Sequence, residues 1–89
     1  MFFAKLEAAA LKIAGDERVI NVDKLLRLLK RKKIKMIGHN EVRFIINKMV
    51  EGKLLANIAQ HDGELYYAIT EEGDERIEQQ KFARRVNMR

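Results

Sequence analysis

A run of positive charge between residues 30 and 35 is the most conspicuous chemical feature of this sequence. Five of its six residues are cations, namely Lys30, Arg31, Lys32, Lys33 and Lys35. Clustered cations neutralise phosphates and release the counterions that are condensed on a nucleic acid. The alternative is a solvated charge run, which is the usual meaning of such a pattern. The run predicts a polyanion-binding surface if the neighbouring elements support one.

The remaining charge is divided unevenly along the chain. The net charge is +5, but residues 1–48 carry 12 Lys and Arg against 5 Asp and Glu, a net of +7. Residues 49–89 carry 6 against 8, a net of −2. This asymmetry predicts one face that meets a polyanion and another face that meets something else.

Residues that commonly perform covalent or metal chemistry are almost absent. The chain has no serine and no cysteine, and Thr70 is its only threonine, so the usual nucleophiles are missing. His39 and His61 are far apart in the sequence, whereas a metal site needs three or four converging ligands. The five glycines occur singly, without a phosphate-binding loop. We therefore expect a protein that is not an enzyme and that uses no metal or cofactor.

The length and composition predict one domain that covers residues 1–89. Apolar residues make up 47% of the chain, which is enough for one core. No apolar run approaches ~20 residues, so we expect no contact with a membrane. The absence of cysteine fits a reducing compartment, and we expect a cytoplasmic protein, associated with the nucleoid if it binds DNA.

Apolar residues recur at helical spacing in four segments, about 2–14, 22–33, 39–51 and 71–86. Gly15 and Asp16 are expected to end the first helix, and Asn21 and Thr70 to cap the second and fourth. The buried stripes are expected to contain these residues: Phe3, Leu6, Ala10 and Ile13; Val22, Leu25, Leu26 and Leu29; Val42, Ile45, Ile46, Met49 and Val50; Ile77, Phe82, Ala83 and Val86.

Strand-like patterns occur in two places. Residues 18–20 predict a brief strand, and residues 54–70 predict a hairpin around Asp62 and Gly63, because tight hairpin turns need positive φ angles. The predicted fold class is α+β with the order α-β-α-α-β-β-α.

Two segments resemble the winged-helix family of small bacterial and archaeal transcriptional regulators. Residues 47–55 (NKMVEGKLL) resemble the end of a recognition helix and its entry into the wing. Residues 67–73 (YAITEEG) resemble the exit from the wing into a last helix. The resemblance covers roughly residues 3–80. It implies a winged helix-turn-helix that binds double-stranded DNA and has a short antiparallel wing.

The resemblance assigns the third helix to the major groove, where its solvent face meets base edges. A helical wheel sets Asn40, Phe44 and Asn47 opposite the apolar stripe, with Arg43 and Lys48 beside them. Arginine can bind guanine bidentately, and asparagine can bind adenine in the same way. Arg43 and Asn47 are the expected base readers and Lys48 a phosphate contact, while Asn40 either joins them or caps the helix. His39 belongs to the same expected DNA-binding set.

Three features leave a protein or RNA as alternatives to double-stranded DNA. The expected wing tip carries Asp62 and Glu64 and no strong base, so it suits DNA poorly and favours a protein partner. Phe44 would contact either a thymine methyl, the wing or a protein. A basic patch alone does not separate DNA from RNA.

The chain ends suggest self-association. Phe2, Phe3, Phe82 and Val86 are apolar residues near the two termini, and terminal helices commonly form the dimer interface in the winged-helix family. We expect a homodimer, because so small a domain gains from additional burial. The basic end, with Lys81, Arg84, Arg85 and Arg89, is expected to be a solvated tail or a DNA contact across a dimer.

Overall fold

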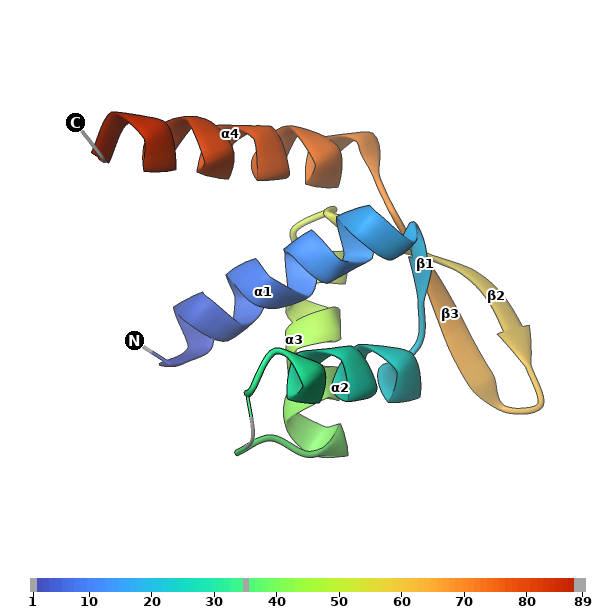
Figure 1. Ribbon diagram of the computed structural model, residues 1–89. Helices are drawn as coiled ribbons and strands as arrows, with labels where there is room; N and C mark the ends of the chain where they lie inside the picture. Colours follow the sequence, from blue (N-terminus) through green and yellow to red (C-terminus); the bar gives the residue numbers. More distant parts are fainter. Residues whose placement is uncertain (1, 35, 88–89) are drawn as a thin grey trace.

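The fold belongs to the α+β class, with four helices and a three-stranded antiparallel sheet (Figure 1). The computed structural model describes residues 2–34 and 36–87, and their side chains over 4–34 and 36–83. The elements follow in the order α1 (Phe2–Glu17), β1 (Val19–Ile20), α2 (Val22–Arg31), α3 (His39–Glu51), β2 (Leu55–His61), β3 (Glu64–Ile69) and α4 (Glu71–Asn87). None of the helices in the described ranges is long and apolar enough to cross a membrane.

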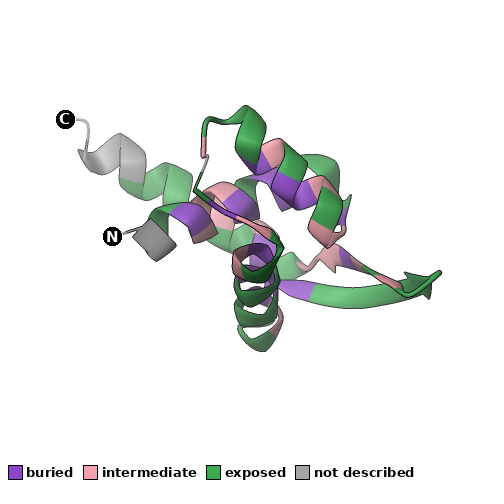
Figure 2. Cartoon of the chain, turned by 90° about the horizontal axis from the view of Figure 1, so that it is seen from below, coloured by how far each residue is buried: buried purple, intermediate pink, exposed green. Residues whose placement is uncertain are grey.

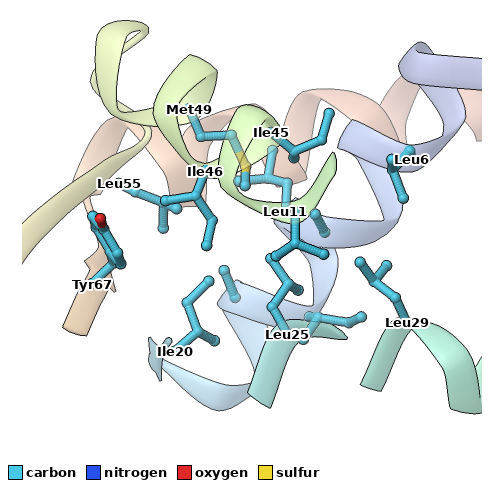
Figure 3. Packing of buried hydrophobic residues seen from close by; sticks show 14 of the residues in the cluster. Leu6, Leu11, Ile20, Leu25, Leu29, Ile45, Ile46, Met49, Leu55 and Tyr67 are labelled. Atoms are coloured by element: carbon cyan, nitrogen blue, oxygen red, sulfur yellow. The ribbon is translucent and has the colours of Figure 1, made fainter. Parts of the chain in front are cut away.

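The core lies where α1, α2 and α3 meet one end of the sheet (Figure 3). Leu25 and Leu29 from α2 face Leu6 and Leu11 from α1, and all four side chains are almost fully buried. The predicted stripe of α3 is confirmed except at its end, since Val50 is only partly buried. The core is completed by these residues: Ala10, Ile13, Ala14, Ile20, Leu26, Ile37, Val42, Ile45, Ile46, Met49, Leu54, Leu55 and Tyr67.

The sheet has the order β1-β3-β2, and its hairpin extends away from the helices (Figure 1). Asp62 and Gly63 both have positive φ, 51° and 78°, which confirms the tight turn expected from their sequence. Between Asn57 and Ala59 the register shifts, so Ile58 forms a bulge on β2. Ile58 is 54% exposed, and every residue of β2 after Leu55 is exposed, whereas β3 is mostly partly buried and contains the buried Tyr67.

Helix α1 is longer than predicted, because Gly15 lies inside it and does not stop it. The reason is packing: a Cβ atom at Gly15 would lie 2.5 Å from the Ile77 side chain of α4. This glycine allows α4 to approach α1 closely. The helix ends at Glu17, after which Arg18 adopts a φ of 69°. Helix α2 is shorter than predicted, since it ends at Arg31.

Helix α4 begins at a cap supplied by Thr70, as predicted. The Thr70 hydroxyl accepts a hydrogen bond from the Gly73 N–H at 3.0 Å and donates one to the Lys53 carbonyl at 2.6 Å. Among the described side chains of α4, those of its first turns are held against the rest of the molecule, through buried Gly73, half-buried Ile77 and the contact of Asp74 with Arg18. The predicted stripe is wrong at Phe82 and Ala83, which are exposed because no other element covers this part of α4.

Candidate nucleic-acid interface

The face of α3 opposite its buried stripe is open to solvent, as the helical wheel predicted. Arg43, Phe44, Asn47 and Lys48 are all exposed there. Figure 2 shows exposed residues along α3 and over most of the hairpin, with the buried residues gathered where the helices meet. The Arg43 guanidinium donates a long hydrogen bond of 3.4 Å to the Asn40 side chain. Among the side chains that the structure describes, Arg43 forms no ion pair.

The start of α3 is fixed by Gly38 and Glu41, not by Asn40. Gly38 is the N-cap residue, and its N–H donates to the Glu41 carboxylate at 2.6 Å. This contact satisfies a backbone donor and turns the Glu41 charge toward the helix start, where it is favourable. Asn40 is left on the exposed side with Arg43, so the capping alternative for Asn40 is wrong.

An ion pair joins the starts of α2 and α3. The His39 Nε2 lies 2.8 Å from an Asp23 carboxylate oxygen, and both side chains are more than half exposed. The exposed position of His39 agrees with its predicted place at the interface, but its nearest partner is an acid.

Phe44 has a cation beside its ring. The Lys48 ammonium lies 5.6 Å from the ring centroid, within the range of a cation–π contact. Phe44 is 47% exposed, so the ring forms a partly covered apolar step on the outer face of α3. Lys48 and Phe44 therefore present charge and apolar surface together.

A hollow of about 490 Å³ lies between α2, α3 and the hairpin. Its charge is mixed, because the cation Arg43 lines it together with the acids Asp23 and Glu64. The hollow is lined by Val22, Asp23, His39, Arg43, Ile46, Asn47, Gly63, Glu64, Leu65 and Tyr67. The acids limit how strongly this hollow alone could attract a polyanion.

The cation run lies at the other end of α2 and in the turn after it. Lys30 and Arg31 occupy the last turn of α2, Lys32 caps it, and Lys33 has a φ of 67°. All four are exposed, while Lys35 lies outside the described residues. Lys32 lines a second hollow with α1 and α4, so the structure does not bring it to the hollow that contains Arg43.

The hairpin carries no Lys or Arg between residues 55 and 69. At its tip His61 contacts Asp62 at 3.2 Å, and Glu64 is partly buried beside the turn. The tip is therefore acidic, as its sequence indicated.

The remaining predicted positions fall into two groups. Phe82 is 69% exposed, which leaves it available for the predicted dimer contact. The side chains of Phe2, Phe3 and Val86 lie outside the described set, as do those of Arg84, Arg85 and Arg89. Within the described ranges, no three His, Asp or Glu residues converge as metal ligands.

The ion pair between Arg18 and Asp74 was not predicted from the sequence. Arg18 binds Asp74 through two hydrogen bonds of 2.9 and 2.8 Å, which join the end of α1 to the start of α4. The hydrogen bonds from Arg18 hold the pKa of Asp74 below its ordinary value, and the charge of Arg18 adds to this effect. The two residues are 56 positions apart, so no local pattern connects them.

Comparison with known proteins gives no relative: no family model, no curated protein and no solved structure matches this chain.

Proposed function

We propose that this chain is a winged-helix domain that binds double-stranded DNA sequence-specifically, as a homodimeric transcriptional regulator in the cytoplasm. The observation that carries the proposal is the outer face of α3, where Arg43 and Asn47 are both exposed and Arg43 donates a long hydrogen bond of 3.4 Å to Asn40. These two side chains have the donors and acceptors that bind guanine and adenine edges in the major groove. In this function α3 is the recognition helix and β2–β3 is the wing.

Charge supports the same docking. Lys48 on α3 would contact a phosphate beside the groove. The exposed cations from Lys30 to Lys33 lie at the end of α2 away from the hollow that contains Arg43, so they would contact phosphates farther along the duplex. The acidic wing tip would remain outside the minor groove, so α3 would supply the base contacts.

The first test is a titration of duplex DNA, followed by fluorescence anisotropy at several salt concentrations. We expect affinity to fall steeply as salt rises, because each neutralised phosphate releases a counterion. Sites selected from random duplex should show a preferred sequence. Arg43→Ala should relax the preference at one base pair, with a loss of about 1–3 kcal/mol on the best site.

A charge reversal tests the phosphate contacts proposed for Lys32 and Lys33. Lys32→Glu with Lys33→Glu should weaken binding to every duplex alike, because phosphates carry no sequence information. The matched control reverses Lys53 and Arg76, two exposed cations that line neither hollow described above. Unchanged binding in the Lys32/Lys33 variant would show that the proposed docking is wrong.

The second candidate function is a protein-interaction module, favoured by the acidic wing tip and by the exposed apolar residues Ile58 and Leu65, 54% and 41% exposed. It predicts that no duplex binds even at low salt. It also predicts that light scattering detects association of the chain with a protein partner. The double variant Ile58→Ser with Leu65→Ser should suppress that association. Tight duplex binding that is sensitive to Arg43→Ala would decide against it.

A further inference from the structure

Helices α1 and α4 run side by side in opposite directions, so that the two chain ends lie on the same side of the molecule (Figure 1). They enclose a groove of about 620 Å³ together with Lys32 from the turn after α2. This volume is within the range of small-molecule sites, about 300–1,000 Å³. The groove lies apart from the hollow between α3 and the wing, with which it shares no lining residue.

The floor of the groove is apolar. Ala8 and Ala9 from α1 and Ile77 from α4 are partly buried in it. The small side chains of the two alanines leave space between the helices, and Ile77 packs toward Gly15. A short apolar chain or ring laid on this floor would cover carbon atoms that now face water.

The rim of the groove is cationic. Lys5, Lys12, Lys32 and Lys81 line it, and no acidic residue does so among the side chains described. Glu78 contacts the Lys81 ammonium at 3.5 Å from the neighbouring hollow and offsets one of these charges. Four ammonium groups held around one groove repel one another, and an anion would relieve that repulsion.

The neighbouring hollow, past Ile77 toward the start of α4, has a mixed lining. Its acids Asp16, Asp74 and Glu78 lie among the cations Lys12, Arg18 and Lys81. The α1–α4 groove is therefore the more positive of the two, because its described lining holds four lysines and no acid.

We propose that the α1–α4 groove is a binding site for an amphipathic monoanion, a small molecule with one carboxylate and an aliphatic or aromatic body. Its apolar body lies on Ala8, Ala9 and Ile77, and its carboxylate accepts hydrogen bonds from the surrounding lysines, which are its strongest contacts. This site does not depend on the DNA-binding function proposed above.

The test uses decanoate as the probe, below its micelle concentration, in isothermal titration calorimetry with the full chain. We expect one saturable site with a dissociation constant on the order of 0.1 mM, as is reasonable for so small a ligand. Decan-1-ol keeps the alkyl chain but lacks the carboxylate, and acetate keeps the carboxylate but lacks the alkyl chain. Each should bind about tenfold more weakly or worse, since each lacks one half of the interaction.

Variants locate the site. Lys12→Gln with Lys81→Gln should weaken decanoate by about tenfold, and Lys53→Gln with Arg76→Gln, which removes the same charge elsewhere, should leave it unchanged. Methyl NMR of the unaltered protein should show decanoate-induced shifts at Ala8, Ala9 and Ile77. A wild-type titration without saturable binding would overturn the proposal.

Three other outcomes would also overturn it. Equal binding of decan-1-ol would show that the lysines take no part. Equal losses in the two double variants would show a nonspecific effect of net charge. Failure of decanoate to bind, together with dimerisation that the Lys12/Lys81 variant abolishes, would show that a second copy of the chain covers the groove.

Discussion

Gly73 is the position where one added methyl group should have the largest effect on stability. In Gly73→Ala the new Cβ would collide with the Leu54 carbonyl oxygen and would lie 2.7 Å from Cγ1 of Ile69. The Leu54 carbonyl cannot move away freely, because it accepts the Thr70 N–H at 3.0 Å. The strain therefore falls on backbone that joins α4 to the sheet.

The magnitude follows from two opposing effects. Replacing a helical glycine by alanine stabilises a helix by about 0.5–1 kcal/mol when space permits. Overpacking destabilises by about 1–3 kcal/mol, and the clash here involves a backbone atom rather than a mobile side-chain end. We expect a net loss of about 1–2 kcal/mol in the free energy of unfolding.

Urea denaturation followed by circular dichroism measures this loss. With a slope of about 1 kcal/mol per molar urea, the midpoint of Gly73→Ala should fall by about 1–2 M. Gly52→Ala is the matched control, because a Cβ at Gly52 would meet nothing closer than 3.5 Å. The reasoning is refuted if Gly73→Ala keeps the wild-type midpoint.

Three further changes have expected outcomes. Thr70→Val removes the cap of α4 and should lower the free energy of unfolding by about 1–2 kcal/mol in urea melts. Thr70→Ser keeps the hydroxyl and should retain most of the wild-type stability. The pKa of Asp74 is lowered in the folded protein by Arg18, so their pair adds stability above the ordinary pKa of Asp. That stability is lost as pH falls through the folded pKa, so thermal melts of Asp74→Asn should show less acid sensitivity than wild type, and equal sensitivity would contradict this. Gly63→Ala places a Cβ at a φ of 78° and should lower the free energy of unfolding by about 1 kcal/mol in urea melts.

The parts of the fold that sequence predicted well are those set by local rules. The stripe of α3 at Val42, Ile45, Ile46 and Met49 follows helical spacing, and burial on one face requires that spacing. The hairpin turn follows from the need for positive φ at two successive residues, which Asp-Gly meets. The outward position of Arg43 follows from the same wheel.

The errors came from contacts between distant segments. In sequence, a glycine that ends a helix looks the same as one that admits a neighbouring helix, so the role of Gly15 depended on where Ile77 lies. Lys32 and Arg43 belong to one predicted DNA-binding set, but they line different hollows. The direction of α2 decides which hollow each one lines, and no local pattern encodes that direction.

The attachment of α4 has a consequence for local opening. From Glu78 to Ala83 every side chain is exposed, while Gly73, Asp74 and Ile77 in the first turns contact the rest of the molecule. Amide hydrogens in this stretch are protected only by the helix itself, so they should exchange with deuterated solvent long before those of α3. A protease should likewise cut this stretch first, and the core made by α1, α2 and α3 should survive the cut.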